Sequence, residues 1–148
     1  MPGTLYLVAT PIGNLGDLTA RAAEVLKAAD LIAVEDTRHA KIVLTRYGVT
    51  TPVESFYDAV ERARTPALLR RLQDGQSVAL ISDAGTPGIA DPGGYLIPQA
   101  IAAGVPVVAI PGPCAAVAAL IVSGLPMDRF VFEGYLPPKP GPRRRRLE

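Results

Sequence analysis

Short apolar runs alternate with amphipathic stretches along most of this chain. The apolar runs cover residues 4–9, 31–34, 53–56, 77–81 and 105–110. The stretches with helical spacing or composition cover residues 18–29, 38–47, 65–73, 95–103 and 115–123. Strands that are almost wholly apolar and are joined by helices form parallel sheets buried on both faces. The pattern therefore predicts an α/β fold with a mostly parallel five-stranded sheet flanked by helices.

Residues with strong preferences at helix ends set some of the expected boundaries. Asp17 or Thr19 is expected to cap the first helix. Thr65 and Pro66 are expected to be the cap and the first residue of the third helix. The segment 129–134 is a further candidate strand.

Proline and arginine dominate residues 136–146. This composition is typical of extended linkers that cannot bury a core. We therefore expect an N-terminal α/β domain at 1–135 and an inter-domain linker at 136–148. A linker with nothing after it suggests the first half of a longer protein, whose second domain is absent.

Composition and charge limit the class of protein. With 49% apolar and 20% charged residues the chain can build a core, and its net charge of +1 does not suggest a protein that coats nucleic acid. The basic residues are unevenly placed, because five of the 15 lie at 139–148 beside a single acid. An acidic body is thus followed by a basic tail.

The chain contains one cysteine and one histidine. These counts exclude a disulfide framework, a cysteine-built zinc site and a multi-histidine site, and no metal is expected. No apolar run reaches the roughly 18 residues of a membrane span, and no signal peptide is visible. We expect a soluble protein of the cytoplasm with no membrane partner.

Three glycine- and proline-rich loops follow the first, fourth and fifth expected strands, at 9–17, 82–94 and 111–115. In an open parallel sheet, the loops after the strands meet at the ligand-binding edge. Glycine allows a backbone to approach a ligand closely, although glycine and proline also simply punctuate turns. None of the loops matches a dinucleotide-binding or P-loop motif, and none contains lysine, which argues against a triphosphate ligand.

The segments VATPIGNLGD, AVEDTRH, SDAGTPGIADPG and PGPCAA occur in this order. In these motifs and their spacing the chain resembles the ribosomal RNA small subunit methyltransferase I group, a branch of the tetrapyrrole methylase-like family. The resemblance implies S-adenosyl-L-methionine as cofactor, bound between two α/β domains. It also implies a homodimer that methylates the ribose 2′-oxygen of a cytidine in small-subunit rRNA, acting on the rRNA or the 30S subunit.

The resemblance also implies which residues bind the cofactor, partly through backbone atoms. They are Pro11, Ala84, Gly85, Thr86, Ile89, Ala90, Cys114 and Ala115. Cys114 stands where the family commonly has a small hydroxyl residue, a change that a backbone contact would tolerate. The segment 55–64 replaces a stretch that often contains His and Asn in relatives, so no role for those groups is expected here.

Methyl transfer to a hydroxyl requires a group that accepts its proton. Glu35, Asp36 and Arg38 follow the second strand at the ligand edge, and we predict that they are catalytic, with a carboxylate as base and the arginine on RNA phosphate. The alternative is structural: Asp36 or Thr37 caps the next helix, and Glu35 stabilises its dipole.

Other polar residues near the loops have structural explanations. His39 is expected to be an exposed helical residue, while Asp83 and Asp91 either hold the shape of their loop or take part in catalysis. The arginines at 143–146 either bind phosphate or belong to a solvated linker.

Two other functions stay open. A tetrapyrrole precursor methylase would share the fold, although a first loop reading TPIGNLGD, where such enzymes more often show G-x-G-x-G-D, points away from it. A non-catalytic domain that docks on the ribosome through the basic tail is the other alternative. If the second domain is missing, the isolated chain should bind cofactor weakly and have little activity.

Overall fold

Five short strands pair in the order β3-β2-β4-β1-β5, and every pair is parallel. The strands are β1 (Leu5–Val8), β2 (Leu31–Val34), β3 (Val53–Ser55), β4 (Val78–Ile81) and β5 (Val107–Ile110). The computed structural model describes residues 1–148, which form two compact units, Met1–Ala115 and Ala116–Glu148. The sheet lies in the first unit and confirms the predicted fold class.

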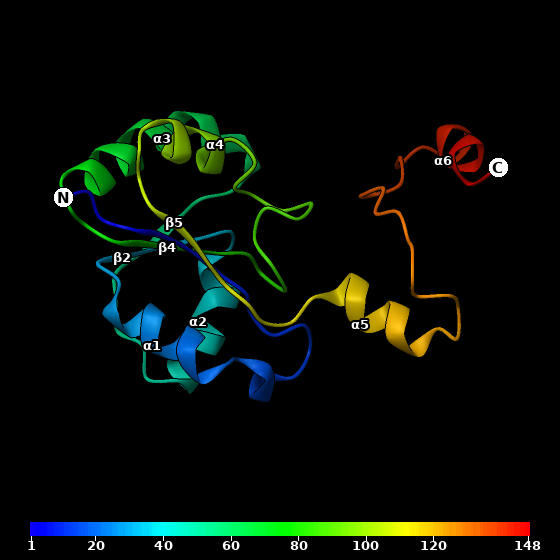
Figure 1. Cartoon of the computed structure of the whole chain (residues 1–148), viewed down its shortest axis with the longest axis horizontal. Coiled ribbons are helices and arrows are strands. Elements are labelled where there is room, and N and C mark those ends of the chain that lie inside the picture. Colours follow the sequence, from blue (N-terminus) through cyan, green and yellow to red (C-terminus); the bar gives the residue numbers. More distant parts are fainter. The chain divides into compact units, whose positions relative to one another are not determined.

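Helices cover both faces of this sheet (Figure 1). They are α1 (Ala20–Ala28), α2 (Thr37–Arg46), α3 (Asp58–Gln73) and α4 (Leu96–Ala102), with a short 3-10 helix, η1, at Leu15–Asp17. Successive residues of β2 lie on opposite faces of the sheet, since Ile32 packs with α1 and α2 while Leu31 packs with α3 and α4. A strand buried on both faces has no polar position, which is why β2 reads as a continuous apolar run.

Helix ends agree with the predictions in two cases and differ in one. Thr19 caps α1 by accepting from the Ala22 N–H at 3.1 Å, and Asp36 caps α2. The prediction that α3 begins at Thr65 and Pro66 is wrong, because this helix begins at Asp58 and contains the proline. The added turns are stabilised by hydrogen bonds that Glu61 accepts from the end of the second loop and the start of α4. Local sequence does not reveal such distant contacts.

The second unit contains most of α5 (Ala115–Val122) and all of α6 (Pro140–Leu147). The candidate strand at 129–134 is wrong, since this segment is irregular and pairs with no strand. The extended linker at 136–146 is also wrong in its second half. Pro140 begins a helix there, and the arginines that follow are good helix formers. The domain boundary at 135 stays a prediction. No helix of the structure is both long and apolar enough to cross a membrane.

At the amino end of the sheet, Asp30 connects the starts of two neighbouring strands. Its carboxylate accepts from the Ser77 backbone N–H at 2.7 Å and from the Ser77 hydroxyl at 2.9 Å. These bonds hold the pKa of Asp30 below its ordinary value of 3.8. A lowered pKa means that these bonds stabilise the fold fully at neutral pH, and that the stabilisation is lost as the pH falls below 3.8 and through the lowered pKa of the folded state.

We therefore expect Asp30→Asn to be less stable than the wild type at pH 7, with the difference shrinking below about pH 4. Urea unfolding followed by circular dichroism at pH 7, 5 and 3 measures this difference. A difference that stays constant down to pH 3 would contradict the role given to the ionised carboxylate.

Candidate functional site

The three glycine- and proline-rich loops meet at the carboxyl edge of the sheet. Thr10 of the first loop and Gly85 of the second form an antiparallel bridge, in which the two N···O distances are 2.9 and 3.0 Å. The Thr86 hydroxyl donates to the Pro113 carbonyl of the third loop at 3.3 Å. The prediction that these loops share one edge is confirmed.

Two glycines make this meeting of loops possible. Gly85 has a φ of +81°, a backbone conformation that residues other than glycine rarely adopt. A Cβ on Gly112 would lie 2.9 Å from the Cβ of Ala9, so the third loop packs directly against the first. The loops therefore present backbone rather than bulky side chains to each other.

A cavity of about 320 Å³ opens between the first loop, the second loop and α2. This volume lies at the lower end of the range for small-molecule sites, roughly 300–1,000 Å³. The lining residues are Thr10, Pro11, Gly13, Leu15, His39, Ala40, Ile42, Val43, Ile81, Ser82, Asp83 and Ala84. Most of the wall is apolar. Its polar part consists of the hydroxyls of Thr10 and Ser82, the imidazole of His39 and the carboxylate of Asp83.

The predicted cofactor residues fall into two groups. Pro11 and Ala84 line the cavity, whereas Gly85 and Thr86 hold the loops together beside it. The remaining ones lie further along the loops: Ile89 is exposed, Ala90 has a positive φ of 58°, Cys114 is a half-buried free thiol and Ala115 begins α5. Their role in cofactor binding stays a prediction.

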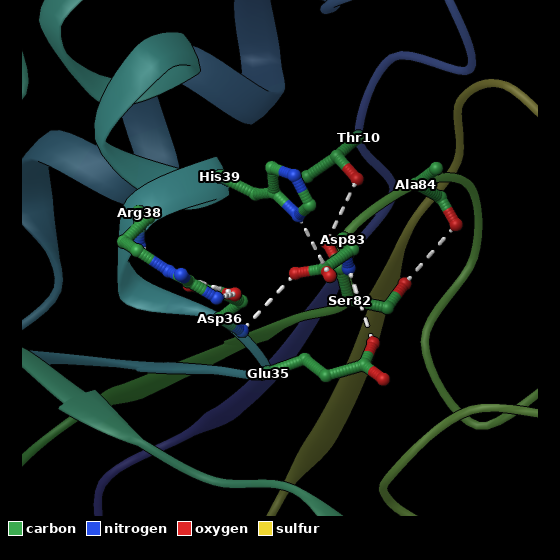
Figure 2. A network of polar contacts seen from close by, with 8 residues as sticks. All are labelled: Thr10, Glu35, Asp36, Arg38, His39, Ser82, Asp83 and Ala84. Carbon is green, nitrogen blue, oxygen red and sulfur yellow. Dashed lines mark hydrogen bonds and ion pairs between the residues drawn. The ribbon is translucent and has the colours of Figure 1, made fainter.

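A polar network joins the start of α2 to the second loop (Figure 2). One carboxylate oxygen of Asp83 accepts from the Asp36 backbone N–H at 3.0 Å, and the other lies 3.0 Å from Nδ1 of His39. The Glu35 carboxylate accepts from the Asp83 backbone N–H at 3.4 Å. Asp83 is thus contacted by the side chains of His39 and Glu35 and by the backbone of Asp36.

Asp36 is held as an anion by its neighbours. Its carboxylate accepts from the Arg38 backbone N–H at 2.8 Å and pairs with the Arg38 guanidinium at 2.6 Å. The arginine holds the pKa of Asp36 far below its ordinary value. The structural alternative for Asp36, the helix cap, is confirmed, while a catalytic part for Asp36 or Arg38 stays a prediction.

Glu35 has the opposite electrostatic environment. Burial raises the pKa of its carboxyl group, and the charges of Asp83, Asp91 and Asp58 raise it further. Burial likewise raises the pKa of Asp91. A carboxyl group with a raised pKa accepts protons more readily, so Glu35 keeps its predicted place as a candidate base. It does not line the cavity, however.

The pairing of His39 with Asp83 was not anticipated from sequence, where His39 was expected to be an exposed helical residue. Its side chain is indeed 64% exposed, but one ring nitrogen is fixed and the ring borders the cavity. Only the strand order shows the pairing, because β2 and β4 are neighbours and the residues that follow them meet. No group of three or more His, Cys, Asp or Glu side chains is placed to hold a metal ion.

The sequence of the chain matches the family model of tetrapyrrole (corrin/porphyrin) methylases over residues 4–148. It is 56% identical to the ribosomal RNA small subunit methyltransferase I of Synechocystis sp., over 99% of this chain and 52% of that protein. It is 52% identical to the protein of the same name from Pseudomonas aeruginosa, again over 99% of this chain and 52% of the relative. The chain therefore spans about half the length of these curated relatives.

Solved structures show the same fold. A conserved hypothetical protein from Aeropyrum pernix K1 superposes with a TM-score of 0.73 at 27% identity, over 88% of this chain and 46% of that one. A uroporphyrin-III C-methyltransferase from Thermus thermophilus superposes with a TM-score of 0.63 at 28% identity, over 85% of this chain and 55% of that one.

Proposed function

Since this chain belongs to the tetrapyrrole (corrin/porphyrin) methylase family, we propose that it is part of an S-adenosyl-L-methionine-dependent rRNA methyltransferase. The proposed acceptor is the ribose 2′-hydroxyl of a cytidine in small-subunit rRNA. The observation that carries this proposal is the 56% identity, over 99% of the chain, to a ribosomal RNA small subunit methyltransferase I.

The residues at the carboxyl edge suit this cofactor. Gly13 lines the cavity, and nothing lies within 4 Å of the place where its Cβ would be, so a side chain there would fill space that the glycine leaves open. The loops offer backbone N–H and C=O groups for a ligand with both donors and acceptors, and mostly apolar surface for its remainder. When bound, S-adenosyl-L-methionine supplies an electrophilic methyl group on a sulfonium centre.

The proposed cofactor ligands are those expected from sequence: Pro11, Ala84, Gly85, Thr86, Ile89, Ala90, Cys114 and Ala115. The second loop supplies most of them, and its bridge with Thr10 holds that loop in place. A site that keeps water out and fixes the acceptor hydroxyl accelerates transfer mainly by positioning, worth on the order of 7–11 kcal/mol in favourable intramolecular cases.

The polar side chains at the start of α2 and just before it are the proposed binding place for RNA. Arg38 has an 88% exposed side chain, and Asp36 fixes the orientation of its guanidinium. A guanidinium that is held in place pairs well with a phosphate oxygen. In this proposal Arg38 contacts the RNA backbone, Asp36 positions Arg38, and Glu35 is a candidate acceptor for the hydroxyl proton.

Partners follow from the proposed substrate. The protein acts on small-subunit rRNA or on the 30S subunit, which places it in the cytoplasm. The resemblance of its sequence motifs supports a homodimer as its proposed assembly. The fold similarity to a uroporphyrin-III C-methyltransferase favours a tetrapyrrole precursor as a second candidate substrate, but at 28% identity compared with 56% for the rRNA enzyme.

The proposal is tested with the full product of the gene that encodes these residues and a methyl-labelled cofactor. Purified 30S subunits, protein-free small-subunit rRNA and uroporphyrinogen III are compared as acceptors, and labelled RNA is digested to nucleosides. We expect label in 2′-O-methylcytidine. Label in the tetrapyrrole alone would favour the second candidate, and label in none of the acceptors would contradict both.

A further inference from the structure

His39 and Asp83 form a fixed acid–imidazole pair on the wall of the cavity. Nδ1 of His39 lies 3.0 Å from one carboxylate oxygen of Asp83. The other oxygen accepts from the Asp36 backbone N–H, so the carboxylate cannot rotate freely. Both side chains line the cavity that Pro11 and Ala84 also line. Figure 2 shows the ring of His39 directed from α2 toward the second loop.

This arrangement determines which ring nitrogen is free. In a neutral imidazole one nitrogen carries the proton, and a carboxylate at Nδ1 favours the tautomer with the proton there. Nε2 then keeps its lone pair, and the ring makes no second hydrogen bond in the structure. A histidine held in this way by a carboxylate presents a basic nitrogen to whatever enters the cavity.

We propose that His39 accepts the proton of the hydroxyl that is methylated, and that Asp83 positions it. This inference rests on the proposed function. The O–H bond of the acceptor hydroxyl breaks, and its proton moves to Nε2. The oxygen forms a bond to the methyl carbon, while the electron pair of the breaking carbon–sulfur bond stays on sulfur. Water then takes the proton from the imidazolium.

The residues predicted to be catalytic are less well placed for this step. Glu35, Asp36 and Arg38 do not line the cavity, whereas His39 and Asp83 do. Asp36 is already occupied as the cap of α2 and as the partner of Arg38, and its very low pKa makes it a poor base. Glu35 accepts from the Asp83 backbone N–H and so supports the residue that positions His39.

The charges around His39 set the direction of its pH dependence. The Asp83 carboxylate raises the pKa of His39 above 6.5, Asp36 also raises it, and Arg38 lowers it. Only neutral His39 can accept a proton, so transfer should increase with pH as His39 loses its charge. Asp83→Asn removes the largest cause of the raised pKa and should move this increase to lower pH.

The first test uses nuclear magnetic resonance, because the chain has a single histidine and its imidazole signals need no assignment by mutation. In ¹⁵N-labelled chain we expect the Nδ1-protonated tautomer at high pH and a pKa above the ordinary value. In Asp83→Asn the pKa should fall and the tautomer preference should weaken. An Nε2-protonated ring in the wild type would overturn the proposal without bearing on methyl transfer itself.

The second test compares methyl transfer by the full gene product and its variants. His39→Ala should reduce kcat by about 10²-fold or more, far more than it changes the affinity for S-adenosylhomocysteine. Lys41→Gln, an exposed position on the same helix, is the matched control and should keep wild-type activity. If Glu35→Gln abolishes transfer while His39→Ala retains it, Glu35 is the acceptor and the proposal is wrong. A wild type that transfers no methyl group overturns the proposed function as well, whereas an active His39→Ala overturns the assignment of His39 alone.

Discussion

Replacing Glu61 by alanine should lower the free energy of unfolding by about 3–5 kcal/mol, since each donor left without its acceptor costs roughly 1–3 kcal/mol. The residue is only 8% exposed, and one carboxylate oxygen accepts from three backbone N–H groups: Gly93 at 3.0 Å, Tyr95 at 2.9 Å and Leu96 at 3.1 Å. These groups end the second loop and begin α4, where backbone N–H groups have no partner within the helix. Alanine would leave all three without their acceptor.

The effect should reach the site as well as the core. Glu61 lies on α3, so its bonds attach the end of the 82–94 loop to a neighbouring helix. Urea unfolding followed by circular dichroism measures the loss. Glu61→Gln keeps one acceptor oxygen and should lose less, and Glu24→Ala at an exposed position of α1 is the control. A loss below about 1 kcal/mol for Glu61→Ala would contradict the anchoring role, since exposed substitutions commonly cost that little.

Gly85→Val should weaken S-adenosylhomocysteine binding at least tenfold. The φ of Gly85 is +81°, and a β-branched residue there costs on the order of 1–3 kcal/mol of backbone strain. A Cβ at Gly85 would meet Ile12 at 3.6 Å and Pro113 at 3.8 Å, which are ordinary contacts. The cost is therefore conformational, and it is relieved by breaking the bridge to Thr10 that joins the first two loops.

Isothermal titration calorimetry with S-adenosylhomocysteine measures this effect on the wild type and the variant. Gly94→Ala is the matched control, because it lies in the same loop, has no positive φ and has nothing within 4 Å of the added Cβ. It should bind as the wild type does. Equal affinities for wild type and Gly85→Val, with both folded, would remove the second loop from the proposed cofactor site.

The parts of the fold that were predicted correctly depend on burial. β2 was predicted with the same ends that the structure shows, because a strand covered on both faces is apolar at every position. The three loops were also predicted to share one edge, since parallel strands all end on the same side. Hydrophobic patterning carries this information directly.

The errors arose where distant contacts override local preference. Thr65 and Pro66 are typical of a helix start, yet the bonds that Glu61 accepts from the end of the second loop and the start of α4 favour a helix that begins earlier. The segment 129–134 has the composition of a strand but no neighbour to pair with. Proline and arginine at 140–147 fit a helix start as well as they fit a linker.

The meeting of the three loops was predicted, but the central contact of the polar network beside them was not. Asp83 and His39 are 44 positions apart, and only the adjacency of β2 and β4 brings them together. Sequence pattern placed both residues after strands but did not supply the strand order. This is why Glu35, Asp36 and Arg38, which form a compact run in the sequence, were preferred as catalytic residues.

The central claim is that these residues belong to an enzyme that methylates the ribose of a cytidine in small-subunit rRNA. Mass spectrometry of nucleosides from purified small-subunit rRNA, with and without the gene in the source organism, tests it most directly. We expect 2′-O-methylcytidine to decrease in the deletion strain and to return when the wild-type gene is restored, but not with Gly85→Val. An unchanged 2′-O-methylcytidine content in the deletion strain would contradict the claim.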